Sequence, residues 1–258
     1  MNEMKKELLN VKNLTAKFGG LTAVDSVEFA VTENEIVSLI GPNGAGKTTT
    51  FNAITGFLER TGGTVTFEGA DLGKLRPNQI AAKGLVRTFQ ITSLFPGLSV
   101  MDNVRTAHHA QEDITFLDCI LNTSRNRNIE KETVAKSTEI LRLVHLENKE
   151  ETLAGNLPCG EQRMLGIALS LAAKPKMLLL DEPSAGLNSS ETGMLMGLIK
   201  RLRDGGITIL LVEHDMKLVM GVSDRIVVLD FGRKIAEGTP EEIKDNPEVI
   251  TAYLGRRR

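Results

Sequence analysis

The sequence has little of what a disulfide-stabilised or membrane-spanning chain needs. It holds 2 cysteines, Cys119 and Cys159, which are too few for a disulfide framework and favour a reducing compartment. No stretch approaches the roughly 18 uninterrupted apolar residues of a transmembrane helix. No charged and then apolar leader opens the chain. We therefore expect a protein that does not cross a membrane by itself.

An excess of charge of one sign is also missing. The chain has 31 Lys and Arg against 33 Asp and Glu, which gives a formal net charge of −2. This balance calls for neither nucleic acid nor an anionic membrane as a partner, and we expect no nucleic acid. The basic end, Arg256 to Arg258, is interpreted as a solvated tail. The 258 residues suit one large or two small domains with a substantial core.

What the sequence does have is a glycine-rich turn between a strand-like run, Ile36 to Ile40, and the onset of a helix. The template Gly-x4-Gly-Lys-Ser/Thr is met by Gly41, Gly46, Lys47 and Thr48. Glycine lets backbone N–H groups point at phosphate oxygens, and a following helix adds unpaired N–H groups and its positive dipole end. Lys47 supplies a charge for the β- and γ-phosphates, and the Thr48 hydroxyl suits Mg²⁺. A chance glycine-rich turn is the alternative, which the flanking strand and helix disfavour. The predicted nucleotide-binding residues of this loop are Gly41, Pro42, Asn43, Gly44, Ala45, Gly46, Lys47, Thr48 and Thr49.

Two kinds of strand are predicted. Near-alternate apolar positions over Leu8 to Ala16, Ala23 to Val31 and Thr64 to Glu68 are typical of half-buried antiparallel strands. The unbroken apolar runs 176–180 and 207–212 are instead typical of strands covered on both faces. Because these runs alternate with helical segments, they imply a parallel sheet with right-handed crossovers.

From Arg87 to about Leu157 the pattern becomes helical. Apolar positions at Ile140, Leu141 and Val144 form a stripe flanked by charge. We interpret this region as an inserted helical subdomain, the alternative being ordinary helices that cover the core. The predicted division is a single domain, 1–258, with a nucleotide-binding core and antiparallel layer (1–88 and 160–235), a helical insert (89–159) and a C-terminal tail (236–258).

Acidic residues follow the apolar run 176–180. Ligands gather at the carboxyl ends of parallel strands, so Asp181, Glu182 and the phosphate loop are expected at one edge. Asp181 would hold Mg²⁺, and Glu182 would orient and deprotonate an attacking water. Adjacent acids at a buried strand end are costly unless metal or donors partner them. An exposed pair of loop residues is the alternative.

Two further polar side chains could complete ATP hydrolysis. His214 follows the second unbroken run and could bond the γ-phosphate or the water, because imidazole can both donate and accept. Gln90 is an uncharged group able to bind metal or water. Taken alone, either could be a packing residue. The predicted catalytic residues are Glu182, His214 and Gln90, and the predicted metal ligands are Thr48, Gln90 and Asp181.

The order of these motifs resembles that of the ATPase subunits of ABC transporters over nearly the whole chain. GPNGAGKT matches that family's Walker A loop, Gln90 its Q-loop, MLLLDEP (Met177 to Pro183) its Walker B strand, SAGLN (Ser184 to Asn188) its D-loop and His214 its switch histidine. Phe18 falls where the family stacks an aromatic ring on adenine. The resemblance implies an α/β fold: a P-loop NTPase core with a mostly parallel sheet, a small antiparallel β subdomain and an inserted helical subdomain.

The family's signature, LSGGQ, is the motif from which this chain departs. Only Leu157 and Gly160 of the segment Leu157 to Arg163 match it directly, and Pro158 has no hydroxyl for the γ-phosphate. A lost hydrogen bond to a charged group is worth about 1.5 to 3 kcal/mol. The resemblance still implies that Gly160 and Glu161, at a helix N-terminus, contact the ATP of a second subunit. We expect a working site in which the signature is the weakest part.

The departures are similar to those of the branched-chain amino acid importers' ATPase (LivG type). The segments that carry this likeness are LPxGEQ, Arg87 to Gln90, Val212 to Ile226 and the ending Asn246 to Gly255. The resemblance implies ATP and Mg²⁺ as cofactors, integral membrane permease subunits, and a second ATPase subunit that is either a copy or a paralogue. It also implies a periplasmic or surface substrate-binding protein as an indirect partner, and a peripheral position on the cytoplasmic face of the cell membrane. The alternatives are a lipopolysaccharide-export-type ATPase, a non-transport ABC ATPase acting on DNA or ribosomes, and a regulatory nucleotide binder that no longer hydrolyses.

Overall fold

The computed structural model describes residues 6–88, 94–109 and 124–254. Gln90, Cys119 and the basic end predicted to be solvated lie outside these residues. The chain forms two compact units. The first comprises Met1–Arg87, Lys176–Ala185 and Thr192–Arg258, and the second comprises Thr88–Pro175 and Gly186–Glu191.

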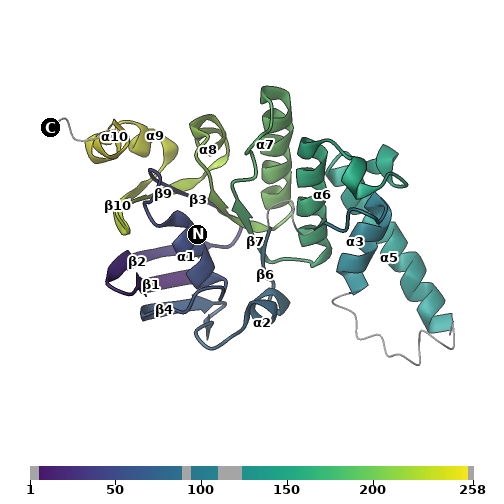
Figure 1. The fold of residues 1–258 in the computed structure, drawn as a ribbon, viewed down its shortest axis with the longest axis horizontal. Coiled ribbons are helices and arrows are strands. Elements are labelled where there is room, and N and C mark those ends of the chain that lie inside the picture. The colour runs from purple at the N-terminus through teal and green to yellow at the C-terminus, as the bar shows by residue number, and fades with distance from the viewer. Residues whose placement is uncertain (1–5, 89–93, 110–123, 255–258) are drawn as a thin grey trace, which may run out of the picture. The chain divides into compact units, whose positions relative to one another are not determined.

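The first unit contains two sheets in its described part (Figure 1). An antiparallel sheet has the order β2-β1-β4-β5, with β1 (Glu7–Phe18), β2 (Leu21–Thr32), β4 (Gly62–Phe67) and β5 (Ala70–Asp71). A larger sheet has the order β10-β9-β3-β8-β7-β6, with β3 (Ile36–Ile40), β6 (Leu85–Arg87), β7 (Met177–Asp181), β8 (Thr208–Val212), β9 (Arg225–Asp230) and β10 (Arg233–Gly238). All of its neighbouring strands run parallel except β9 and β10. The predicted α/β fold with a mostly parallel sheet is confirmed.

The helices of the first unit connect these strands or, in the case of the last two, follow β10. They are α1 (Lys47–Ile54), α2 (Pro77–Ala82), α7 (Ser189–Asp204, whose first turn belongs to the second unit), α8 (Met216–Val222), α9 (Pro240–Lys244) and α10 (Pro247–Leu254). One continuous cluster of buried side chains joins the two sheets, and Phe51 and Ile54 of α1 belong to it. A second cluster includes Ile40, Val228 and Val249, and it attaches α10 to the larger sheet. Burial of these side chains is the main force that holds β3, and with it the loop that follows, in place.

The second unit is helical in its described part. Helices α3 (Val100–His109), α5 (Ser124–Leu143) and α6 (Cys159–Ala172) each contact the other two. Buried Val104, Leu141 and Leu165 supply one apolar residue from each helix. This unit contains α6 and Gly186–Glu191, both of which the predicted division placed in the nucleotide-binding core. Apolar residues on several sides of α6 are compatible with either neighbour, so its sequence alone does not select one.

The predicted strands agree with the structure in position and direction. The three half-buried runs are β1, β2 and β4, which pair antiparallel. The two unbroken runs are β7 and β8, which pair parallel in the interior of the larger sheet. Sequence analysis did not identify the β9–β10 hairpin. No helix in the described stretches is long and apolar enough to cross a bilayer.

Candidate nucleotide-binding site

The glycine-rich loop connects β3 to α1, and two of its glycines have no room for a side chain. Gly41 has a φ of 150°, and a Cβ there would lie 2.1 Å from the Leu229 carbonyl oxygen. Gly46 has a φ of 97°, and its Cβ would lie 2.7 Å from the Ala23 carbonyl oxygen. The chain therefore passes close to β9 and β2 at points where only glycine fits. Because Gly46 is the N-cap of α1, no cap side chain covers the first N–H groups of that helix.

Lys47 lies folded back over this loop. Its Nζ donates to the carbonyl oxygens of Gly41, at 2.8 Å, and Pro42, at 3.0 Å. Burial lowers the pKa of Lys47, and the negative charge of Glu182 acts in the opposite direction. The ammonium group is thus mostly removed from water and bound to neutral carbonyls, which a phosphate oxygen can replace.

The register of the larger sheet brings three strand ends together. Val212 of β8 pairs with Leu39 of β3 on one side and with Asp181 of β7 on the other. The backbone N–H of Glu182 continues the ladder by donating to the Val212 carbonyl at 2.8 Å. The glycine-rich loop, the pair Asp181 and Glu182, and the segment that begins at Glu213 therefore leave the sheet at one edge. Parallel strands place their ligands at this edge.

Glu182 has a left-handed backbone with a φ of 47°. A non-glycine residue in this conformation costs roughly 1 to 3 kcal/mol, and such strain often occurs at functional sites. The conformation turns the chain sharply after Asp181, so the two adjacent carboxylates leave the backbone in different directions. Two acids separated in this way can have different tasks.

Glu213 is a buried carboxylate that sequence analysis missed. It has no exposed surface, and it accepts hydrogen bonds from the backbone N–H groups of Ser184, at 2.7 Å, His214, at 3.0 Å, and Asp215, at 3.3 Å. It therefore ties the turn after β7 to the turn after β8. An acid that directly follows a mostly apolar, strand-like run was the available signal, and it was applied to Asp181 but not to Glu213. The neighbouring His214 side chain is 60% exposed.

The remaining predicted site residues occupy other places. Phe18 ends β1 with its ring half exposed. Gly160 and Glu161 lie in the first turn of α6, in the second unit. A Cβ on Gly160 would meet the Glu191 carboxylate at 2.5 Å, and Glu161 accepts from Lys149 at 2.6 Å. The roles assigned to these residues stay predictions, and the predicted hydrolytic Gln90 lies outside the described residues.

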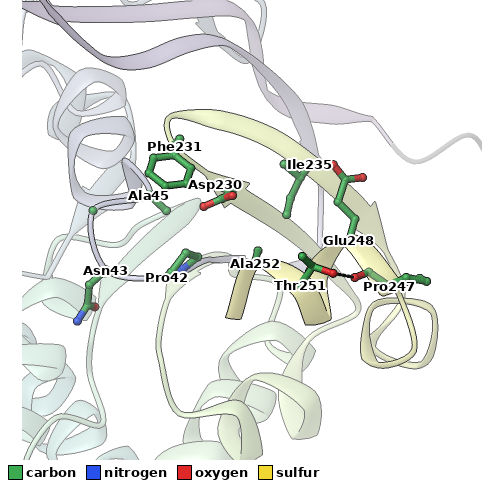
Figure 2. Close-up of a pocket in the computed structure, with 11 residues that line it drawn as sticks. Pro42, Asn43, Ala45, Asp230, Phe231, Ile235, Pro247, Glu248, Thr251 and Ala252 are labelled. Carbon is green, nitrogen blue, oxygen red and sulfur yellow. Dashed lines mark hydrogen bonds between the residues drawn. The ribbon is translucent and has the colours of Figure 1, made fainter. Parts of the chain in front are cut away.

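The outer side of the glycine-rich loop borders the C-terminal helix. Pro42 to Ala45 line an open pocket of about 870 Å³ together with residues of β9, β10 and α10 (Figure 2). Phe231 and, from α10, Ala252 both line this pocket. The next residue is Tyr253. Burial raises the pKa of its hydroxyl, and the Gly41 backbone acts in the opposite direction.

Comparison with known families identifies this arrangement. Residues 24–185 match a family model described as ABC transporter. The chain belongs to the ABC transporter ATP-binding family. Residues 233–258 of this ABC ATPase match a second model, described as branched-chain amino acid ATP-binding cassette transporter.

Proteins similar to this ABC ATPase match it from end to end. It is 48% identical over 253 residues to the high-affinity branched-chain amino acid transport ATP-binding protein LivG of Salmonella typhimurium, with 98% of this chain and 99% of LivG covered. It is 46% identical to the corresponding protein BraF of Pseudomonas aeruginosa, with the same coverage. It is 33% identical to the lipopolysaccharide export system ATP-binding protein LptB of Escherichia coli, with 96% of this chain and 97% of LptB covered.

Solved cassettes share the fold of this ABC ATPase. The ADP conformation of MJ1267, an ATP-binding cassette of an ABC transporter, matches with a TM-score of 0.85 at 30% identity, covering 97% of this chain and all of that one. A dimeric, post-hydrolysis state of the cassette MJ0796 bound to ADP and Pi matches with a TM-score of 0.76 at 26% identity, covering 90% of this chain and 99% of that one.

The donor atoms at the strand edge of the ABC ATPase suit Mg²⁺. The Asp181 carboxylate and the Thr48 hydroxyl are hard oxygen donors, which Mg²⁺ prefers. The described residues hold no group of three or more His, Cys, Asp or Glu side chains arranged for a metal ion. Mg²⁺ fits such a site because it usually binds through one or two protein groups together with phosphates and water.

Proposed function

We propose that this ABC ATPase binds and hydrolyses MgATP to power the import of branched-chain amino acids. The observation that carries the proposal is the meeting of the glycine-rich loop, Asp181–Glu182 and His214 at one sheet edge, where the negative charge of Glu182 acts on Lys47. The loop binds the triphosphate through its backbone N–H groups, and Lys47 exchanges its carbonyl partners for phosphate oxygens.

Each remaining residue of the proposed site has one task. Thr48 and Asp181 would hold Mg²⁺, with Gln90 as a further ligand, and the metal would supply positive charge to offset that of the β- and γ-phosphates. Glu182 orients the attacking water and accepts its proton, while His214 hydrogen-bonds the γ-phosphate. Glu213 positions His214 by accepting a hydrogen bond from the His214 backbone N–H. Phe18 stacks on the adenine ring.

The proposed catalytic site is completed by a second ATPase subunit. The N-terminus of α6, with Gly160 and Glu161, contacts the γ-phosphate held by that subunit. This step is supported by the resemblance to dimeric cassettes such as MJ0796 in its ADP- and Pi-bound state. Pro158 is the N-cap of α6 and makes no side-chain cap bond, so the backbone donors of the helix carry the contact. ATP closes the dimer, and hydrolysis reopens it.

The substrate class rests on two similarities. Identity is 48% to LivG and 46% to BraF, against 33% to LptB. The segment 233–258 also matches the branched-chain amino acid cassette model. Import therefore has more support than lipopolysaccharide export. The proposed partners are integral membrane permease subunits, and indirectly a substrate-binding protein, with this subunit on the cytoplasmic face of the cell membrane.

ATPase activity in a reconstituted transporter tests the proposal. The chain is co-purified with its permease subunits, placed in liposomes and supplied with a binding protein loaded with leucine. We expect ATP hydrolysis to rise when the loaded binding protein is added, with leucine accumulating in the lumen. Hydrolysis that responds to DNA or ribosomes but not to the permease would overturn the proposal. No hydrolysis at all would support a regulatory nucleotide binder.

A further inference from the structure

Arg87, which ends β6, holds the carboxylate at the end of the neighbouring strand. Its Nη2 lies 2.6 Å from Oδ2 of Asp181, and the two side chains are only 10% and 15% exposed. Arg87 pairs in register with Leu179, so its side chain reaches two residues further along β7. The sequence motifs give this arginine no role of its own; it appears there only as the first residue of the segment Arg87 to Gln90.

The same guanidinium is fixed on its other side by α1, the helix that follows the glycine-rich loop. Nη1 donates to Oδ1 of Asn52 at 2.7 Å. The guanidinium carbon lies 5.7 Å from the ring centre of Phe51 and 5.9 Å from that of Phe57. Phe51 itself is fully buried in the main core. Arg87 is thus a planar cation held between aromatic rings, an amide and a carboxylate.

This arrangement is selective for arginine. A buried charge is costly unless several partners satisfy it, and a planar guanidinium can bond two groups while lying against rings. Lysine has a single compact ammonium that cannot bond Asn52 and Asp181 with the same geometry. The arrangement therefore fixes one carboxylate oxygen of Asp181 relative to α1, whose N-terminus belongs to the phosphate loop.

We propose that Arg87 is a positioning residue for the magnesium site: by holding Oδ2 of Asp181, it directs Oδ1 towards Mg²⁺ or a water bound to it. The proposal rests on the function proposed above, in which Asp181 serves the metal. Residues that orient a metal ligand typically change metal affinity or activity by about 10- to 100-fold when they are replaced.

Arg87 is also the last residue of the first unit, because the chain enters the second unit at Thr88. The same side chain that orients Asp181 therefore anchors the point at which the chain leaves the nucleotide-binding unit.

The test is a Mg²⁺ titration of the purified chain at saturating ATP, followed by the rise in melting temperature. We expect Arg87→Gln to raise the Mg²⁺ concentration at half effect by about 10- to 100-fold. ATP binding measured without Mg²⁺ should stay within about twofold of the original chain, because the role proposed for Arg87 acts through Asp181 and the metal rather than through the phosphate loop. The Mg²⁺ midpoint of Arg87→Lys should lie between those of the original chain and Arg87→Gln, because lysine keeps the positive charge but loses the two-pronged guanidinium.

The matched control is Arg203→Gln, which removes another guanidinium paired with carboxylates of the first unit, those of Asp204 and Asp224. It should leave the Mg²⁺ midpoint unchanged. An unchanged midpoint in both Arg87 variants, while Asp181→Asn shifts it, would overturn the positioning role and leave the proposed function intact. An unchanged midpoint in Asp181→Asn would instead remove Asp181 from the metal site. Should Arg87→Gln unfold, Arg87→Lys alone decides the outcome.

Discussion

Lys47 carries a charge that the fold has largely removed from water and paired with two carbonyl oxygens. We expect Lys47→Ala to weaken ATP binding by roughly 10-fold to more than 100-fold, since a charge-assisted hydrogen bond is worth about 1.5 to 3 kcal/mol. Folding should be little affected, because the variant no longer buries an ammonium. Binding of a fluorescent ATP analogue measures the change, and Lys176→Ala, which removes an exposed pair with Glu68, is the control. Equal affinities in the two variants would contradict the role of Lys47.

Glu213 accepts three backbone N–H groups without any exposure to solvent. In Glu213→Gln an amide NH₂ replaces one acceptor oxygen and faces a donor. We expect a loss of stability of about 1 to 3 kcal/mol. Turnover should fall while ATP affinity is kept, because the turns that carry Ser184 and His214 lose their common anchor. Urea unfolding and steady-state kinetics measure both effects, and a variant with unchanged turnover would show that the tie is dispensable.

Glu35 gives the fold a dependence on pH. Burial alone would raise the pKa of Glu35. Hydrogen bonds from Arg225 and Thr32 lower it by more than burial raises it, so the pKa lies below the ordinary 4.5. The folded state then binds fewer protons than the unfolded state as the pH falls. The stabilisation from Glu35 is therefore present above about pH 4.5 and is lost as the pH drops through the folded value.

We accordingly expect Glu35→Gln to lower the free energy of unfolding at neutral pH by about 1.5 to 3 kcal/mol, the range for a hydrogen bond to a charged group. The difference from the original chain should shrink in acid. Urea unfolding at a series of pH values measures it. A difference that does not change with pH would mean that the ionised carboxylate is not what stabilises the fold.

Helix α10 packs against the sheet through Val249, and the Gly41 backbone of the glycine-rich loop acts on the hydroxyl of its Tyr253. Tyr253→Phe keeps the ring and removes that hydroxyl. We expect ATP affinity to fall roughly 2- to 10-fold, matching a neutral hydrogen bond of about 0.5 to 1.5 kcal/mol. Thr251→Val is the matched control, because its hydroxyl bonds only Pro247 within the same helix in the bonds described here. Calorimetric ATP titration compares the two variants, and equal affinities would show that Tyr253 of α10 does not support ATP binding by the loop.

Among the elements, those whose form depends on local sequence were predictable. The glycine-rich loop needs glycine where Gly41 and Gly46 meet neighbouring backbone, and its spacing is visible in the chain. The buried strands β7 and β8 were visible as unbroken apolar runs. The partners of α6, the contact of α10 with the loop and the pairing of Arg87 with Asp181 were not predictable in this way. They depend on which distant segments become neighbours, and a single sequence does not state this. The roles of Gln90, Gly160 and Glu161 stay predictions.

At the level of the assembled molecule, the proposed site needs two subunits. We expect Glu182→Gln to bind ATP but not hydrolyse it, so that the closed dimer accumulates. Size-exclusion chromatography with MgATP should show a dimer for this variant and mainly monomer for the original chain, whose dimer reopens after hydrolysis. The double variant Lys47→Ala/Glu182→Gln, which binds ATP poorly, should remain monomeric. Monomer alone in Glu182→Gln would argue against Glu182 as the catalytic base.

The position of β3 in the larger sheet has a consequence for biosynthesis. This early strand lies between β8 and β9, which are made more than 160 residues later, since Ile36 pairs with Ile209 and Val37 with Arg225. Until the ribosome has passed both partners, the strand Ile36–Ile40, which is buried along its whole length in the folded protein, lacks the two strands that pair with it, and long-range pairing of this kind is slow. The nascent chain therefore cannot form its ATP cradle until nearly all of it has been translated, and it needs protection from aggregation in the meantime.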